Sequence, residues 1–410
     1  MKPTFRLALF ACLCPFASPA QEAEPGGVFF TFDVGQTFEG TTDRDLETTA
    51  KESGVDSLTS LSFGAVSETR SQRLSFNLGT DLRISEGDFS ADATTARLAY
   101  TRNSANAVFD VSLSSRREDI AFLRDASDFI NDEGEIELPD DFDDLTGDGL
   151  RFETTLAASL RWGEIEPIGY SMRASFRTLR YDEASVALVD SDEATLGFGL
   201  RLNINEITTG NIDLSYTQTD EAGSPVTDTA RLSAAVTFAR PLGDLTTGIS
   251  ITREDDGDIF WAASVEREFA LSNGRLRGEL GLVEDEGGDP RLTGGIAFSY
   301  PRPTGQIDLS AFRSLSAGDD RATTTISASY RQDLSPISGM RVGFDFGQSS
   351  DSDGGDVLST GSLSVSYEVS LTDVWQLNVG ARANLRDDDG TRTRSNSVFV
   401  TLERPFSWRP

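Results

Sequence analysis

The sequence repeats one alternating pattern along nearly its whole length. From about Val28 onward, segments of about ten residues carry an apolar side chain at every second position, with small, hydroxylated, amide or arginine side chains between them. In segment 73–84 (RLSFNLGTDLRI), Leu74, Phe76 and Leu78 occupy alternate positions. We call such a set of alternate positions along a strand a parity. Successive side chains of a β-strand point to opposite faces, so each segment forms a ribbon with one apolar and one polar face. A sheet of such ribbons, closed with its apolar face outward, is a barrel that can sit in lipid.

The alternation predicts about twenty strands, and 18–22 strands are compatible with the pattern. The predicted strands are 28–38, 58–69, 72–84, 94–103, 107–117, 150–162, 168–181, 193–203, 211–219, 229–238, 245–253, 259–269, 275–283, 291–300, 305–314, 323–332, 339–348, 358–369, 373–385 and 394–404. We therefore expect an all-β fold, a single transmembrane antiparallel up-and-down β-barrel over residues 21–410.

The connections between the predicted strands alternate in length. Those after even-numbered strands are short, such as 70–71 and 104–106, whereas those after odd-numbered strands, such as 39–56 and 118–149, are mostly longer and acidic. Membrane barrels of the outer-membrane type have short periplasmic turns and longer extracellular loops. The same arrangement is expected here, and an even strand number places both termini on the short-turn side.

Aromatic residues are concentrated beside the short turns, where they would form a belt at one membrane–water interface. They are Tyr100, Trp162, Tyr170, Phe238, Phe269, Tyr300, Tyr330, Tyr367 and Trp375. A sparser belt is expected at the opposite interface. Its candidates are Phe38, Tyr181, Trp261, Phe312 and Phe346.

The first twenty residues have the features of a cleaved signal peptide. Lys2 and Arg6 precede an apolar stretch, Leu7–Phe16, and a small-residue site ends at Ala20. An alternative is a lipoprotein signal with Cys12 as the lipidated residue. The two cysteines, Cys12 and Cys14, both lie in this segment, and the chain has no histidine. Thiol nucleophiles, histidine bases and the commonest zinc ligands are therefore missing from the predicted mature chain, which favours a protein that is not an enzyme.

The formal net charge is −31, which disfavours nucleic acid as a partner. Much of the acidic charge lies in the predicted loops. Segment 140–148 is rich enough in carboxylates for a weak Ca²⁺ site, although it does not match the EF-hand pattern. The candidate ligands are Asp141, Asp143, Asp144 and Asp148. No other cofactor or metal site is expected.

A soluble β-sandwich or an extracellular β-repeat protein would also show alternating strands. The alternating loop lengths and the one-sided aromatic residues count against that alternative. The small side chains of the polar face also count against it; in segment 358–369 they are Ser362, Ser364 and Ser366. A solvent-facing sheet usually carries larger charged and amide side chains.

The C-terminal segment 397–408 (SVFVTLERPFSW) is similar to the aromatic-ended last strand of Gram-negative outer-membrane barrels. Together with the repeated strands, it makes the mature chain resemble proteins of the diffusion-porin type. Here Arg409 and Pro410 follow the final aromatic residue, whereas the family most often ends on the aromatic residue itself. The resemblance implies a location in the bacterial outer membrane.

Porins also fold their third long loop into the barrel, where acidic loop residues face basic residues of the wall. The resemblance assigns this role to loop 118–149, and an external acidic flap is the alternative. The acidic candidates are Asp125, Asp128, Asp132 and Glu133. The pore-lining candidates, which share the polar faces of their strands, are Arg73, Arg83, Arg97, Arg151, Arg161, Arg173 and Arg177. These arginines could equally pair with carboxylates on neighbouring strands to fasten the inner face together.

We expect a passive channel for small hydrophilic solutes or ions. The alternative is a closed structural or adhesive barrel without channel activity. Only about seven residues separate the predicted cleavage site from Val28, which disfavours a transporter with an N-terminal plug domain. The expected partners are outer-membrane lipids, lipopolysaccharide and small hydrophilic solutes. A homo-oligomer is left open.

Overall fold

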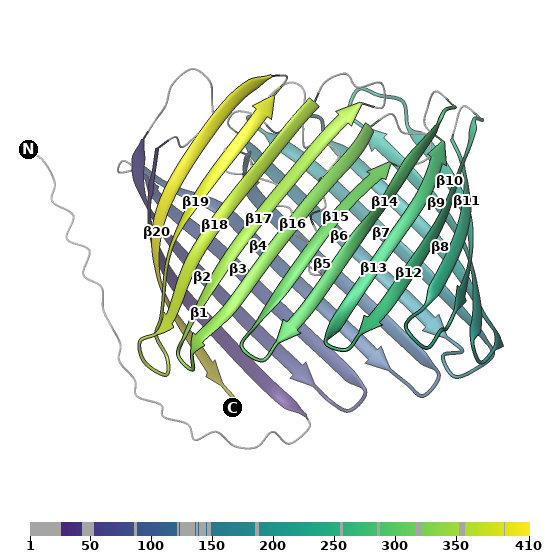
Figure 1. Cartoon of the computed structure of the whole chain (residues 1–410), viewed down its shortest axis with the longest axis horizontal. Helices are drawn as coiled ribbons and strands as arrows, with labels where there is room; N and C mark the ends of the chain where they lie inside the picture. The colour runs from purple at the N-terminus through teal and green to yellow at the C-terminus, as the bar shows by residue number, and fades with distance from the viewer. Residues whose placement is uncertain are drawn as a thin grey trace, which may run out of the picture.

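Twenty antiparallel strands form one closed sheet in the computed structural model (Figure 1). Consecutive strands pair with one another around the barrel, and β1 also pairs with β20, so the sheet has no free edge. The structure describes residues 26–42, 53–85, 88–120, 123, 136, 138, 145, 149–184, 188–254, 257–284, 288–315, 321–351, 357–388 and 390–410. Within these ranges no helix is both long and apolar enough to span a membrane.

All twenty predicted strands are confirmed, with ends that differ by a few residues. The strands are β1 (Gly27–Thr41), β2 (Gly54–Glu68), β3 (Gln72–Ser85), β4 (Asp88–Asn103), β5 (Ala107–Asp119), β6 (Leu150–Trp162), β7 (Ile168–Asp182), β8 (Ser191–Asn205), β9 (Thr208–Glu221), β10 (Thr227–Phe238), β11 (Leu245–Arg253), β12 (Ile259–Leu271), β13 (Gly274–Glu284), β14 (Pro290–Arg302), β15 (Gly305–Leu315), β16 (Arg321–Ser335), β17 (Ser338–Asp351), β18 (Val357–Ser370), β19 (Gln376–Asp388) and β20 (Thr391–Trp408). Most strands are longer than predicted because backbone pairing continues past the last apolar residue into polar sequence.

The two faces of the sheet differ in chemistry as the alternation predicts. Leu113 on β5 lies opposite Leu156 on β6, and these side chains are 40% and 47% exposed with no protein covering them. On the other face hydroxyl groups bond across strands, as between Thr195 and Thr217, whose oxygens are 3.0 Å apart. The apolar parity therefore forms the outside of the barrel, and the polar parity lines the enclosed space, the lumen.

The C-terminal aromatic residues pack across the seam at which β20 pairs with β1. On the outer face the Phe30 and Trp408 rings stack with centroids 5.3 Å apart, and Phe32 packs against Phe406. On the inner face the hydroxyl oxygens of Thr37 and Thr401 lie 2.8 Å apart. A strand edge left open in lipid would expose backbone hydrogen-bonding groups at a large cost, so this seam is essential to the fold.

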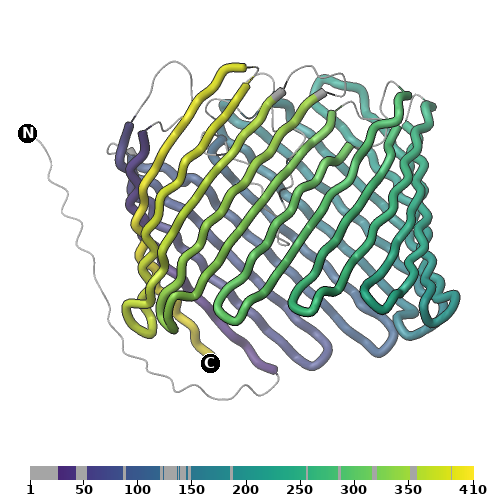
Figure 2. The backbone as a smooth tube through the Cα atoms, viewed as in Figure 1, coloured from purple at the N-terminus to yellow at the C-terminus, as the bar shows by residue number. Residues whose placement is uncertain are grey.

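The short connections and the C-terminus lie at one rim, which we call the short-turn rim (Figure 2). Aromatic residues gather on the outer face beside it, and Trp162 and Tyr170 stack there with ring centroids 5.3 Å apart. The opposite belt is only partly as predicted. Tyr181 and Phe312 were expected in it, but both lie on the inner face, where Tyr181 pairs with Arg151 and Phe312 with Gly295. Residues separated by an even number of positions on one strand share a face. Tyr181 therefore faces the lumen together with Arg177.

A matched pair of substitutions tests which face meets lipid. We expect Leu113→Arg to destabilise the inserted barrel by about 2–4 kcal/mol, the cost of an arginine on the lipid side near mid-membrane. The neighbouring change Ser112→Arg places the same charge in the lumen and should cost far less. Urea unfolding in lipid vesicles measures both. Equal costs for the two variants would contradict the assignment of faces.

Candidate functional site: the inner wall of the barrel

All seven predicted arginines lie on the inner parity of their strands. Arg83 is held by two carboxylates, with Nη1 2.9 Å from Asp56 Oδ2 and Nε 2.6 Å from Asp92 Oδ2. Asp92 reaches Arg83 because the β3–β4 register shifts at this point, so that Ala91 pairs with Leu82 and Asp92 is the extra residue. A bulge of this kind redirects one side chain relative to the regular alternation.

A row of alternating charges crosses the inner face of three strands, β5 to β7. Arg116 and Arg151 flank the buried Glu118, and Arg151 and Arg177 both contact Glu153 at 2.8 Å. We call these five residues the β5–β7 charge ladder. Arg151 is also buried, so its charge is stabilised by carboxylates and not by water. The ladder joins the two strands from which the 118–149 loop leaves and to which it returns.

The other predicted arginines lie in more open surroundings. Arg161 and Arg173 are each 53% exposed and face Asp110 at 3.8 Å and Asp213 at 3.1 Å. Arg73 lies opposite Glu68 on β2 and is exposed. Arg97 lies on the same face, opposite Ser114. The expectation that these arginines pair with carboxylates holds for Arg83, Arg151, Arg161, Arg173 and Arg177.

Apolar residues gather inside the barrel at the rim opposite the short turns. Ile120, Leu123 and Leu145, which belong to the 118–149 connection, form a buried cluster with Leu188 and Leu358. We call it the mouth cluster. Leu358 lies on the inner face of β18, twelve strands along the chain from β6. Parts of the connection and a separate part of the wall therefore meet in one apolar contact.

Exposure of the inner wall changes with depth. Near the mouth cluster, polar side chains are buried, among them Asp56, Ser349 and Thr360, and Thr360 is only 1% exposed. Toward the short-turn rim, charged side chains are open, and Arg331 is 58% exposed. Inner side chains are therefore more exposed toward the short-turn rim than beside the mouth cluster.

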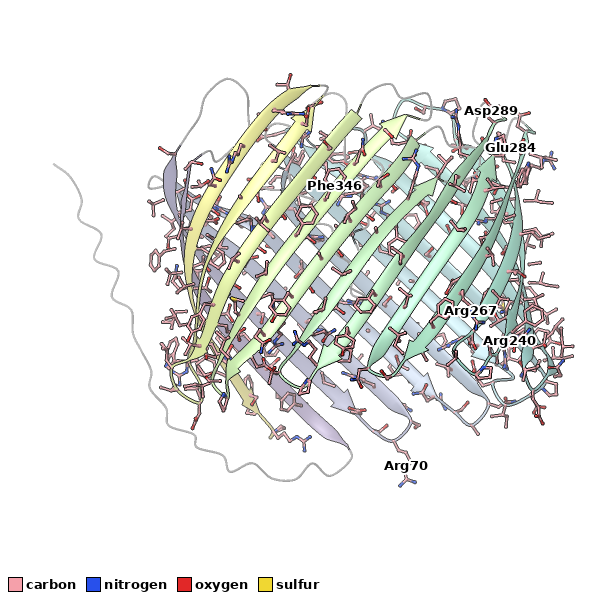
Figure 3. All side chains as sticks on the ribbon, viewed as in Figure 1. Arg70, Arg240, Arg267, Glu284, Asp289 and Phe346 are labelled. Atoms are coloured by element: carbon pink, nitrogen blue, oxygen red, sulfur yellow. The ribbon has the colours of Figure 1, made fainter. Side chains whose placement is uncertain are left out.

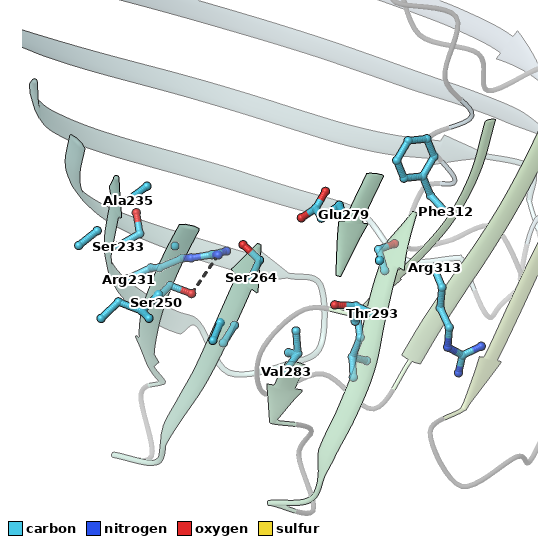
Figure 4. A pocket seen from close by; sticks show the side chains of 18 residues that line it. Arg231, Ser233, Ala235, Ser250, Ser264, Glu279, Val283, Thr293, Phe312 and Arg313 are labelled. Atoms are coloured by element: carbon cyan, nitrogen blue, oxygen red, sulfur yellow. Dashed lines mark hydrogen bonds between the residues drawn. The ribbon is translucent and has the colours of Figure 1, made fainter. Parts of the chain in front are cut away.

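Two recesses mark the open part of the wall. One of about 390 Å³ is framed by Arg231, Glu279 and Phe312, and Arg231 donates a 3.1 Å hydrogen bond to Ser250. Figure 4 shows Phe312 and its neighbour Arg313 pointing in opposite directions. The other recess, of about 700 Å³, is lined by acidic side chains and by hydroxyl groups of β1, β2 and β20. Its acidic residues are Asp33, Asp81 and Glu403.

Sequence reasoning assigned Phe312 to the outer face and did not single out the carboxylates of the two recesses. The sequence feature that could have revealed the recesses is a set of small inward-facing residues on neighbouring strands, such as Gly248, Ser264 and Gly281. Their small side chains leave space on the lumen side of the wall. At Gly295 a Cβ atom would lie only 2.0 Å from the Phe312 ring. The ring therefore covers this position, and any side chain in place of Gly295 would force the ring to move.

Several predicted residues lie outside the part of the chain that the structure describes. These are the signal peptide 1–20, the loop candidates Asp125, Asp128, Asp132 and Glu133, and the calcium candidates Asp141, Asp143, Asp144 and Asp148. Among the described residues, no group of three or more metal-binding side chains is placed to hold an ion.

Comparison with known proteins supports the fold. No family model matches the sequence, and no curated protein matches it. Solved outer-membrane receptors share the architecture at about one-tenth sequence identity. The ferric enterobactin receptor PfeA from Pseudomonas aeruginosa, solved with enterobactin, is 10% identical with a TM-score of 0.53, over 94% of this chain and 82% of the receptor. The siderophore receptor PirA from Acinetobacter baumannii is 9% identical with a TM-score of 0.54, over 94% and 81%. The chain thus resembles outer-membrane β-barrels in fold.

The burial of the charge ladder gives a stability prediction. We expect Arg151→Gln to lower the free energy of unfolding by about 3 kcal/mol, because it leaves Glu118 buried with one arginine fewer beside it. Arg173→Gln removes an exposed ion pair and should cost at most about 1 kcal/mol. Urea unfolding in detergent micelles compares the two. A loss at Arg151 no larger than that at Arg173 would contradict the structural role of the ladder.

Proposed function

We propose that this protein is an outer-membrane channel through which small hydrophilic solutes or ions diffuse passively. In this proposal the short turns face the periplasm, the acidic loops face the exterior, and the polar inner wall contacts water. The signal peptide would direct export and be cleaved near Ala20. Lipids and lipopolysaccharide would surround the barrel, and no catalytic step or cofactor is involved.

The observation that carries the proposal is the exposure of charged groups inside a closed barrel. Arg173, which lies within β7, is half exposed and could not stay ionised against an empty or apolar lumen, because an unsolvated charge is very costly. Barrels of 16–18 strands already enclose an aqueous channel, and this one has twenty. A water-filled passage lined by both signs of charge suits polar solutes better than apolar ones.

In the proposed channel the 118–149 connection narrows the mouth. The mouth cluster supports this role, because Ile120 and Leu145 are completely or almost completely buried and share the cluster with Leu358 of the wall. The charge ladder would hold both ends of the connection at the inner wall. The passage is then narrowest at the external end and widens toward the periplasm.

The same cluster favours a second candidate function, a closed barrel that serves a structural or adhesive role. If the apolar contact seals the mouth, exposed charges below it would line a water-filled but blind cavity. The two candidates predict different electrical behaviour, so one type of measurement separates them.

Reconstitution in planar lipid bilayers tests the channel directly. We expect discrete single-channel steps from the purified barrel. Heat-dependent migration on a detergent gel serves as the control that the protein is folded. A folded barrel that gives no steps would contradict the channel and support the closed alternative.

The constriction is tested by loosening the mouth cluster. We expect Leu358→Ser to raise single-channel conductance, because it removes the wall residue against which the connection packs. Leu363→Ser, on the outer face of the same strand, is the matched control and should leave conductance unchanged. Deletion of residues 121–147 should raise conductance further. Unchanged conductance in both the Leu358 variant and the deletion would show that the connection does not limit flow.

A further inference from the structure

Arginines on the outer face near the short-turn rim have different partners from the arginines inside the barrel. Arg240, Arg267 and Arg404 each lie over an aromatic ring, and none has a carboxylate within ion-pair distance among the described residues. This is unexpected in a chain with 67 acidic and 36 basic residues. Figure 3 shows Arg240 and Arg267 near the short-turn rim, whereas Glu284 and Asp289 lie at the opposite rim.

Arg404 is the most enclosed of the three. It is on the outer face of β20, because it pairs with Val34 of the apolar parity. Its guanidinium carbon is 4.5 Å from the centroid of the Phe406 ring and 5.3 Å from that of Trp375. The Nε atom is buried without a hydrogen-bond partner in the described structure. No ligand can therefore reach Nε, and the donors left for one are those of the two terminal nitrogens, Nη1 and Nη2.

Arg240 and Arg267 form a pair on β10–β12. Arg267 lies 5.1 Å from the centroid of Phe269, and Arg240 lies 5.8 Å from that of Phe238. Arg267 and Phe238 are both opposite Leu245, one on each side, so they lie in one row across the outer wall. Neither guanidinium group forms an ion pair with a carboxylate of the described residues.

The opposite rim supplies a contrast on the same outer face. There Arg180 binds both oxygens of Asp192 at 2.7 and 2.6 Å, which occupies its donors within the protein. The arginines at the short-turn rim stack on rings, and this contact covers the face of a guanidinium but leaves its edge donors available. Those edge donors match the geometry of an oxyanion.

The position of these groups selects the anion. Aromatic belts lie at the level of lipid headgroups, and the short turns of outer-membrane barrels face the periplasm. We infer that Arg240 with Arg267, and Arg404 separately, bind the phosphate of phospholipids in the periplasmic leaflet, with Phe238, Phe269, Trp375 and Phe406 supporting the guanidinium groups. The phospholipids hold the barrel at a fixed depth, and this role is independent of channel activity.

Native mass spectrometry of the purified barrel tests the inference. The barrel is released from mixed micelles that contain either phosphatidylglycerol or diacylglycerol with the same acyl chains. We expect bound phosphatidylglycerol but little bound diacylglycerol. Arg404→Gln, and the double change Arg240→Gln/Arg267→Gln, should each weaken phosphatidylglycerol binding about tenfold, the effect of losing one or two charge-assisted hydrogen bonds.

Controls separate the site from general charge attraction. Arg70→Gln removes the same charge from the tip of the β2–β3 turn at the same rim and should leave binding unchanged (Figure 3). Arg404→Lys keeps the charge but loses the planar fork, and should bind more weakly than wild type. Gel migration confirms that each variant is folded.

Three results would overturn the inference. The first is binding of diacylglycerol as tight as that of phosphatidylglycerol. The second is an Arg70→Gln loss equal to that of the site variants. The third is displacement of phosphatidylglycerol by excess inorganic phosphate, which would assign the arginines to a free anion and not to a lipid.

Discussion

The structure depends on the pairing of β1 with β20. In lipid, backbone groups have no water with which to bond, so a sheet that spans a membrane must satisfy all of them by closing. Closure then fixes the side-chain arrangement, because one parity of every strand must face outward and the other inward. The chemistry of the wall, the mouth cluster inside it and the arginines of the outer rim all follow from that division.

Charge is handled differently in three zones of the molecule. Beside the mouth cluster, arginines and carboxylates are buried together, as Arg151 is with Glu118 and Glu153. Deeper in the lumen the pairs are exposed and would contribute little to stability; in the proposed channel they would shape the electric field along the passage. On the outer face at the short-turn rim, aromatic rings take the place of carboxylates beside arginine. Arginine thus has buried carboxylate partners in the first zone, exposed carboxylate partners in the second and aromatic partners in the third.

The strands were predictable from the sequence because each one repeats a two-residue period over many residues, and a shift by one residue would reverse every face. The inward arginines were predictable for the same reason. The partners of these arginines were less predictable from the sequence. Asp92 reaches Arg83 because of a bulge, and Arg177 contacts Glu153 because of the register between β6 and β7. Tyr181 and Phe312 were misplaced because aromatic character was given more weight than parity. The recesses depend on which small residues become neighbours across strands, which no single segment reveals.

The central claim is that one parity contacts lipid and the other encloses water. The predicted mature chain has no cysteine, so single cysteines can be introduced from Ile212 to Tyr216 on β9 and given a spin label. Paramagnetic resonance in vesicles then compares collisions with oxygen, which concentrates in lipid, and with a water-soluble nickel complex. Labels at 212, 214 and 216 should meet mainly oxygen, and those at 213 and 215 mainly the nickel complex. Accessibility to the nickel complex at every position, or no alternation with residue number, would contradict the account.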